Sequence, residues 1–329
     1  MKTVLVSGAS GIVGYGVLKS LRGQSVKLIG TTIYPESAAN CFSDVLELAP
    51  KTSAPSYLDW LRGIIQKYDI DMIIPCIEDD MFLWNKHREM LSTLTYPLLN
   101  ADSLILLCAD KWKFYETLAE HNSIYRIDTT LEADFDTLGT RFGLPFLLKP
   151  RRGFASKGII KVTDKATFDA HKSDIGSVLM VQPIMGDTEH EYTVSAFFDA
   201  DGRLCCWQQL RRKLSQAGFT EIAETVELEN IEIVLTDLAR IFHPVGPTNF
   251  QFREDNGVLK LLEINPRISS STSIRTAFGY NEALMSIGYF LDGEKPIQPT
   301  LKNGKAIRYT EDFILHSSII TIGNTGRKQ

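Results

Sequence analysis

Short apolar runs alternate with amphipathic stretches over roughly the first third of the chain. The apolar runs predict three strands: Val4–Val6, Lys27–Gly30 and Asp71–Pro75. The amphipathic stretches predict three helices: Ile12–Arg22, Tyr57–Lys67 and Met81–Leu91. Strands that alternate with helices in this way indicate a parallel sheet with helices on both faces. The chain therefore begins with an α/β unit.

The pattern changes after a helix that is expected to begin near Asp110. A small α+β unit follows, with strands at Phe146–Lys149, Ile159–Val162 and Val178–Val181 and a helix at Lys165–Lys172. Longer alternating segments then predict antiparallel strands and one helix: Glu191–Phe198, Leu204–Leu214, the helix Leu228–Phe242, Asn249–Arg253 and Val258–Asn265. The last residues, His316–Gln329, read as a polar tail of low order.

Composition and charge exclude several classes of protein. The chain has 329 residues, which suggests two or three domains, and its 35 Lys and Arg against 40 Asp and Glu give a net charge of −5. No basic block suited to nucleic acid occurs, and no apolar run approaches the roughly 20 residues of a membrane helix. The five cysteines include no Cys-x-x-Cys pair, so we expect a reducing, cytoplasmic location.

The first predicted turn, Gly8-Ala9-Ser10-Gly11-Ile12-Val13-Gly14, spaces three glycines as some epimerases and short-chain dehydrogenases do. A dinucleotide site also needs an acidic residue after the second strand, and that strand ends in Thr31-Thr32-Ile33-Tyr34. The one Tyr-x-x-x-Lys pair, Tyr15 and Lys19, falls inside the first helix. Tight packing of strand against helix is therefore the favoured interpretation, and an NAD(P)-dependent epimerase or dehydrogenase is the alternative.

Three acidic residues, Glu78, Asp79 and Asp80, follow the third predicted strand at its carboxyl end. Ligands of open α/β sheets gather at that end of the strands. Acidic side chains also stabilise the beginning of a helix. The sequence leaves both roles open for Glu78: contact with a substrate, or stabilisation of the helix start.

Four features follow in a fixed order along the rest of the chain. They are Lys111, the run Leu148-Lys149-Pro150 before a glycine-containing loop, the segment Val181–Glu189, and Gln251 followed by Glu263-Ile264-Asn265-Pro266-Arg267. Together they resemble the ATP-grasp superfamily, and in particular single-unit proteins similar to the carbamoyl phosphate synthase large subunit. The resemblance covers Asp110 to about Leu301.

The resemblance implies a fold and a domain organisation. An N-terminal Rossmann-like parallel-sheet domain over residues 1–110 would precede the ATP-grasp fold. That fold would comprise a small α+β lid over residues 111–185 and an antiparallel-sheet core over residues 186–329, which includes the C-terminal tail. The lid would close over ATP, because an acyl phosphate exposed to water hydrolyses.

The resemblance also implies a metal site. Glu263 would bridge two Mg²⁺ (or Mn²⁺) ions, with Gln251 on one ion and Asn265 on the other. Glu263 and Asn265 are two apart on a strand and so share a face, which Gln251 must share too. A two-residue loop at Asn256-Gly257 would put Gln251 opposite Leu262, whereas a three-residue loop or an equivalent bulge puts it opposite Glu263. We predict the odd-length loop.

By the same resemblance, other residues would bind the nucleotide or act in catalysis. The expected contacts are Lys111 and Lys149 on phosphates, Ser156 and Lys157 in the following loop, Gln182 and Ile184 on adenine, Glu189 on ribose, and Arg267 with Lys149 in catalysis. Glu191, two residues after Glu189, points the same way and remains an alternative to it. Arg211, Arg212 and Lys213 end a strand, where they either meet ligand or form a solvated basic edge, and Arg211 and Lys213 share one face of that strand.

These features predict an ATP-dependent carboxylate–amine ligase. It would form an amide or peptide bond through an acyl phosphate and release ADP and phosphate. The partners would be small-molecule carboxylates and amines, with no nucleic acid or membrane, and a homodimer is left open. A non-catalytic ATP-binding protein is a further alternative.

Overall fold

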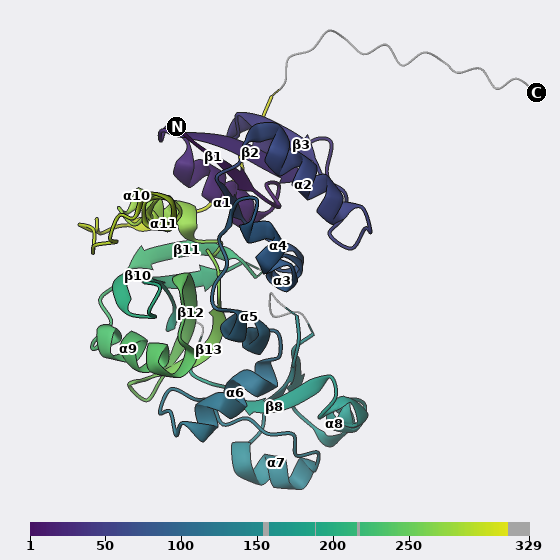
Figure 1. Cartoon of the computed structure of the whole chain (residues 1–329). Coiled ribbons are helices and arrows are strands. Elements are labelled where there is room, and N and C mark those ends of the chain that lie inside the picture. Colours follow the sequence, from purple (N-terminus) through teal and green to yellow (C-terminus); the bar gives the residue numbers. More distant parts are fainter. Residues whose placement is uncertain (154–157, 188, 216–217, 315–329) are drawn as a thin grey trace, which may run out of the picture.

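The computed structural model describes residues 1–153, 158–187, 189–215 and 218–314. The strands of these residues form three sheets, which lie in an N-terminal unit, a small unit at the opposite end and a large sheet between them (Figure 1). The predicted loop contacts Ser156 and Lys157 and the predicted tail His316–Gln329 lie outside the described residues. Among the helices of the described part, none has the length and apolar character needed to cross a membrane.

The N-terminal unit confirms the predicted parallel sheet with helices on both faces. Its strands, in the order β3-β2-β1-β4-β5, are β1 (Lys2–Val6), β2 (Val26–Thr32), β3 (Val45–Leu48), β4 (Met72–Ile74) and β5 (Tyr96–Pro97). Its helices are α1 (Ile12–Leu21), η1 (Ala38–Cys41), α2 (Tyr57–Tyr68), α3 (Glu78–Lys86), α4 (Arg88–Ser92) and α5 (Asp102–Cys108). The sequence pattern had not indicated β3, β5 and α5, which are short.

One predicted helix of this unit is wrong in its extent. The pattern predicted a single helix over Met81–Leu91, but α3 begins at Glu78 and ends at Lys86, and α4 begins at Arg88. At His87 between them, the backbone adopts φ −113° and ψ 24°, outside the helical range. The guanidinium of Arg88 donates to the Asn85 side chain and to the Asn100 carbonyl, which holds the chain in this bend.

The small unit at the other end consists of β6 (Phe146–Pro150), β7 (Ile160–Val162), β8 (Leu179–Pro183), α7 (Phe135–Phe142), α8 (Lys165–Asp169) and η2 (Lys172–Asp174). We call it the lid unit. Its antiparallel strands lie in the order β7-β6-β8, and its own apolar core contains Leu138, Phe146, Phe168 and Val181. The predicted helix Lys165–Lys172 is shorter than expected, because it ends at Asp169 and a 3₁₀ turn follows.

The strands of the central sheet pair antiparallel, in the order β13-β12-β9-β10-β11-β14. Its strands are β9 (Glu191–Phe198), β10 (Leu204–Leu214), β11 (Thr220–Thr225), β12 (Gly246–Asp255), β13 (Val258–Asn265) and β14 (Lys305–Ile307). The bounds of β9, β10 and β13 agree with the prediction residue for residue. The alternation of side chains along β9 separates an apolar face from a polar one.

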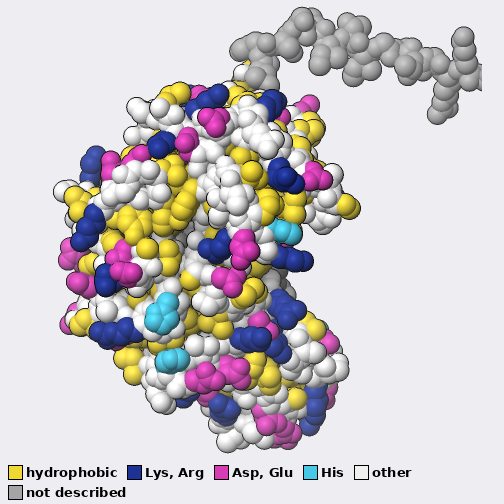
Figure 2. Space-filling view, viewed as in Figure 1, with side chains coloured by type: hydrophobic (Ala, Val, Ile, Leu, Met, Phe, Trp, Pro, Cys, Tyr) yellow, Lys and Arg dark blue, Asp and Glu magenta, His cyan; other side chains and the backbone are white. Residues whose placement is uncertain are grey.

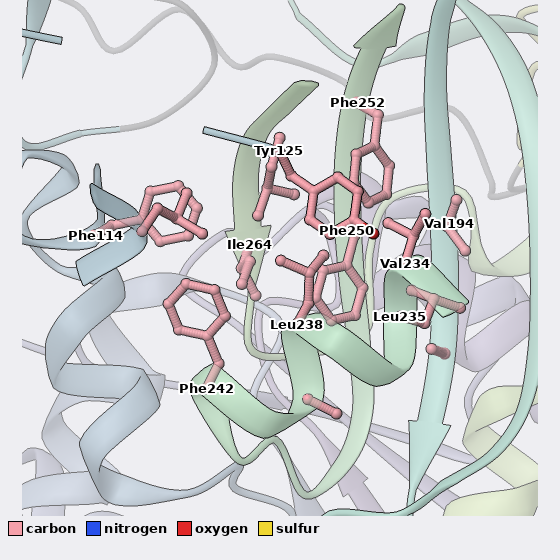
Figure 3. Packing of buried hydrophobic residues seen from close by; sticks show 14 of the residues in the cluster. Phe114, Tyr125, Val194, Val234, Leu235, Leu238, Phe242, Phe250, Phe252 and Ile264 are labelled. Carbon is pink, nitrogen blue, oxygen red and sulfur yellow. The ribbon is translucent and has the colours of Figure 1, made fainter. Parts of the chain in front are cut away.

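Helices cover both faces of the central sheet. On the apolar face, α9 (Ile231–Phe242) and α6 (Lys111–Glu120) pack against the strands, and Figure 3 shows Leu238 of α9 beside Phe250. On the polar side lie α10 (Thr272–Ala277) and α11 (Glu282–Asp292). Ile287 of α11 also packs into the core of the N-terminal sheet, so the two units share apolar contacts.

The hairpin of β12 and β13 differs from its prediction in one respect. Asp255 pairs with Val258, so the turn has two residues, Asn256 and Gly257, with φ of 50° and 77°. The predicted odd-length loop is therefore wrong. The register shifts instead between Gln251 and Phe252, where Leu262 is the additional residue of a bulge. This bulge places Gln251 opposite Glu263. Gln251 therefore lies on the same strand face as Glu263, as a shared metal site requires.

Candidate active site

Two cavities meet at the carboxyl end of β13. The first lies between the lid unit and the central sheet, and the second between the N-terminal unit and the central sheet. Lys111, Arg152, Gly153 and Glu263 line both. Figure 2 shows a concave edge between the N-terminal unit and the lid unit, along which Lys and Arg side chains gather. A ligand that spans both cavities would pass Glu263.

The two predicted phosphate lysines both line the first cavity. Lys149, on β6, donates from Nζ to the Tyr115 hydroxyl at 3.3 Å and lies 5.4 Å from the centre of that ring. Lys111, the first residue of α6, has its Nζ 3.9 Å from Oε1 of Glu263 and donates to the Gly153 carbonyl. The structure therefore brings both lysines to one cavity.

Asp110 fixes the position of Lys111. Its carboxylate accepts from the Trp112 backbone N–H at 3.0 Å and from the Arg151 guanidinium at 2.7 Å. Burial by itself would raise the pKa of Asp110, but the hydrogen bonds from Arg151 and Trp112 hold that pKa below its usual value. Asp110 is thus ionised at neutral pH and anchors the start of α6 next to the lid unit.

The predicted metal ligands share one face of the central sheet. Gln251 lies opposite Glu263 across β12 and β13, and Asn265 follows two residues later. Gln251 lines the first cavity, Asn265 the second and Glu263 both. The Oε1 of Gln251 already accepts from Arg212 at 2.7 Å and keeps one lone pair for another partner.

The side chains of Gln251, Glu263 and Asn265 suit a Mg²⁺ ion that also binds the phosphates of a nucleotide. One carboxylate and two amides are oxygen ligands of the kind Mg²⁺ prefers, while in the described part of the chain no group of three or more His, Cys, Asp or Glu side chains is arranged to hold a metal. Such a site leaves room for phosphate oxygens and water to complete the octahedron. The residues therefore fit a metal that arrives with a nucleotide.

A buried carboxylate that sequence reasoning left as an alternative forms the back of the first cavity. Glu191 is 6% exposed in its side chain and accepts from Arg212 at 2.9 Å and from Arg253 at 2.9 Å. Glu189, the predicted ribose contact, is exposed and does not line the cavity. The register offered a signal, because Arg253 pairs directly with Glu191 on the neighbouring strand.

Arg212 is the member of the basic strand end Arg211–Lys213 that reaches the site. Arg211 instead bonds Glu224 at 2.6 Å on the exposed face. Arg212 lies on the same face as Glu191 and bonds both Glu191 and Gln251. The alternation was correct, and it is the intervening arginine that reaches the site.

The end of β8 and the residues after it form the apolar end of the first cavity. Gln182, Pro183 and Met185 line it, and the buried Gln182 amide donates to Thr129 at 2.7 Å, which leaves its carbonyl oxygen available. Ile184, the predicted adenine contact, is 40% exposed and its side chain is not part of the lining. A role for Ile184 would therefore have to use its backbone.

In the second cavity, Glu78 and Arg267 meet across the boundary between the N-terminal unit and the central sheet. Nη2 of Arg267 donates to Oε1 of Glu78 at 3.2 Å, and Nη1 donates to the Ile268 carbonyl at 3.0 Å. Ile77, the residue before α3, makes no side-chain capping bond, and the Glu78 carboxylate is directed to Arg267. Asp79 and Lys113 also line this cavity.

The glycine-rich turn after β1 is explained by packing. Gly8 has φ of +56°, and a Cβ on Gly14 would lie 2.4 Å from the Gly8 carbonyl oxygen. A side chain at Gly14 would therefore push α1 away from β1. The favoured packing interpretation agrees with this geometry.

Comparisons with known proteins agree with the resemblance. Residues 177–313 match a family described as "ATP-grasp in the biosynthetic pathway with Ter operon", and residues 10–99 match the "PylC-like, N-terminal domain". No curated protein sequence matches the chain significantly.

Solved structures share the fold over nearly the whole chain. N5-carboxyaminoimidazole synthetase from Staphylococcus aureus, complexed with ADP, has a TM-score of 0.72 at 16% identity and covers 91% of this chain and 80% of its own. The biotin carboxylase domain dimer of Hydrogenobacter thermophilus 2-oxoglutarate carboxylase, complexed with MgADP, ADP and bicarbonate, has a TM-score of 0.69 at 15% identity, with coverages of 92% and 73%. At this identity the likeness concerns the fold. Residues 177–313 thus match an ATP-grasp family, and the fold of about nine-tenths of the chain is shared with these solved structures.

Proposed function

We propose that this chain is an ATP-dependent carboxylate–amine ligase that forms an amide or peptide bond and releases ADP and phosphate. The observation that carries the proposal is the position of Glu263, which lines both the cavity of Lys111 and Lys149 and the second cavity beside Arg267. A phosphate bound beside Glu263 would face both cavities. Transfer of that phosphate to a molecule in the second cavity is the reaction this arrangement serves.

The nucleotide would occupy the first cavity. Lys149 and Lys111 would bind its phosphates, and Gln182 with the backbone of Ile184 would contact the adenine in the apolar end. Ser156 and Lys157 remain proposed contacts from the loop between β6 and β7, and Glu189 a proposed contact of the ribose. Mg²⁺ held by Glu263, Gln251 and Asn265 would neutralise phosphate charge.

The chain's own residues position and stabilise the reacting groups. In the first step a substrate carboxylate attacks the γ-phosphorus, the bond to ADP breaks and an acyl phosphate forms. Arg267, whose planar charge suits a transferring phosphoryl group, would stabilise that step, and Lys149 would stabilise the departing ADP. An amine then attacks the acyl carbon and phosphate leaves. Contact of the lid unit with the nucleotide would keep water away from the acyl phosphate.

The domain organisation is part of the proposal, with residues 1–110, 111–185 and 186–329 as three domains. The packing of α6 bears on the boundary between residues 110 and 111. Phe114 and Leu118 of α6 belong to the core of the central sheet, whereas the lid unit has a core of its own, so α6 packs with the central sheet. All five cysteines are free thiols, which supports the proposed cytoplasmic location. A homodimer is proposed by analogy with the biotin carboxylase domain dimer, and sedimentation would test it.

Trapping with hydroxylamine tests the proposed function. The protein is incubated with ATP, Mg²⁺ and hydroxylamine and with each member of a panel of amino acids and sugar acids. A ligase of this kind forms a hydroxamate from the correct carboxylate and one ADP for each hydroxamate. Binding of ATP without ADP release for any carboxylate would favour a non-catalytic ATP-binding protein, and binding of NAD(P)H in place of ATP would favour the epimerase or dehydrogenase.

A further inference from the structure

The second cavity is bounded by acidic side chains of the N-terminal unit on one wall and by the predicted catalytic residues on the other. Glu78 and Asp79 come from the start of α3, while Glu263, Asn265 and Arg267 come from the end of β13 and the residues after it. The carboxylates of Glu78 and Asp79 thus lie across the cavity from the place where an acyl phosphate would form.

Several other charges of the cavity already have partners of opposite charge, whereas Lys113 of α6, which also lines it, forms no ion pair with any described residue. Lys111 lies 3.9 Å from Glu263, and Asp110 is bound by Arg151 and lies 3.9 Å from Arg152. Asp79 makes no ion pair with any described residue of the chain. The N-terminal unit contributes carboxylates and no Lys or Arg to the described lining of this cavity.

Glu78 is paired with a residue that the reaction would need elsewhere. The side chains of Arg267 and Glu78 are 15% and 23% exposed, so their pair is largely removed from water. A phosphoryl group with more than one negative charge competes for Arg267 and draws it from a single carboxylate. Glu78 would then be a largely buried carboxylate without a cation, which is unfavourable.

We propose that the amine substrate binds as an alkylammonium group on Glu78, with Asp79 beside it, and that this group replaces Arg267 as the partner of Glu78. The inference rests on the proposed function. It names the substrate class as a basic alkyl amine, such as the amino group of an amino acid. It excludes a weakly basic aromatic amine, because such an amine is uncharged at neutral pH and does not compensate the carboxylate.

Glu78 has a second task in this arrangement. The bound ammonium transfers one proton to the Glu78 carboxylate and becomes a neutral amine. The amine forms the new C–N bond with the acyl carbon while the bond from that carbon to the phosphate oxygen breaks. The second proton of the nitrogen leaves with the phosphate, and Glu78 returns its proton to solvent.

The test compares two amines of different charge on the same acyl phosphate. Hydroxylamine, which is uncharged at neutral pH, reports formation of the acyl phosphate, and a panel of amino acids and short alkyl diamines reports amide formation. We expect the wild-type protein to use alkyl amines and to discriminate against aniline. In Glu78→Gln, the ratio of amide to hydroxamate should fall roughly tenfold to a hundredfold, the range for loss of one charge-assisted hydrogen bond.

Glu89→Gln is the matched control, because Glu89 is an exposed carboxylate of the same unit that lines neither cavity. An unchanged ratio in Glu78→Gln overturns the assignment, as does an equal fall of both products, which would mean that Glu78 serves only to hold Arg267. Use of aniline as readily as alkyl amines, or of no alkyl amine at all, overturns it too. If the wild-type protein forms no hydroxamate with any carboxylate, the proposed function fails first, and the two failures are thereby distinguished.

Discussion

At the scale of single residues, the site depends on which strand face each polar side chain occupies. The pair of Glu263 and Asn265 could be recognised from the sequence, because it interrupts an apolar run at the end of a predicted strand. The choice between Glu189 and Glu191 could not be made in the same way, since both have the same parity. Only the contacts with Arg212 and Arg253 identify Glu191 as the buried member.

Glu263 is expected to be required for turnover and dispensable for folding. Its side chain is 28% exposed and its nearest cation, Lys111, is 3.9 Å away, so little stability depends on it. Glu263→Gln should lower the rate of ADP release roughly a hundredfold or more, by loss of charge at the phosphate site. Thermal unfolding should stay within a few degrees of the wild type.

Glu221→Gln provides the control for this variant. Glu221 is an exposed carboxylate on β11 of the same sheet and lines neither cavity. Its substitution should leave ADP release unchanged. Near-normal turnover in Glu263→Gln would contradict the metal assignment.

Glu191 is expected to matter for stability. Its removal takes the counter-charge from Arg212, which is 6% exposed. It also takes the carboxylate partner from Arg253, which is 24% exposed. Glu191→Ala should lower the free energy of unfolding by about 3 kcal/mol, the scale for breaking a buried pair. Denaturant unfolding measures this, and Glu189→Ala should change the same quantity by less than about 0.5 kcal/mol because Glu189 is exposed. Similar losses in the two variants would argue against the buried network.

Among the secondary-structure elements, the β12–β13 hairpin was predicted in part: an irregularity was expected, but its position was not. The requirement that Gln251 share a face with Glu263 predicted an irregularity in the hairpin, and one is present at Leu262. Its location could not be predicted, because Asn256-Gly257 suits a two-residue turn and a bulge further along satisfies the same parity. Short elements such as β5 and β14 were missed, since two or three residues carry too little pattern.

Tyr115 of α6 supports this bulge from the neighbouring helix. Its hydroxyl donates to the Leu262 carbonyl at 2.6 Å and accepts from Lys149 at 3.3 Å, so it connects the bulge with a phosphate lysine. Tyr115→Phe should lower the free energy of unfolding by about 1 kcal/mol. It should also weaken ATP binding several-fold, which titration calorimetry measures.

The exposed Tyr309 offers a control for the loss of a hydroxyl. Tyr309→Phe should change neither the unfolding free energy nor ATP binding. If Tyr115→Phe behaved like Tyr309→Phe, the hydrogen bond from Tyr115 to Leu262 would contribute nothing to the unfolding free energy or to ATP binding.

At the scale of the whole molecule, the three units differ in how their apolar cores are connected. Ile268, Ala283 and Ile287, which follow β13 in the chain, pack into the core of the N-terminal sheet. The lid unit instead has a separate core around Phe146 and Phe168. The N-terminal unit and the central sheet should therefore unfold together, while the lid unit has fewer apolar contacts to hold it.

This difference predicts the pattern of hydrogen exchange. Amides of β6 and β8 should exchange roughly tenfold faster than those of β9 and β12, because opening the lid unit exposes only its own small core. A non-hydrolysable ATP analogue with Mg²⁺ should slow β6 and β8 and leave β9 nearly unchanged, since Lys149 and Gln182 lie on the two lid strands. The analogue without Mg²⁺ is the control, and its effect should be smaller, because the phosphates would then meet Glu263 without a cation between them. Uniform protection of all three sheets would mean that the lid unit does not open independently, and the exclusion of water would then need another cause.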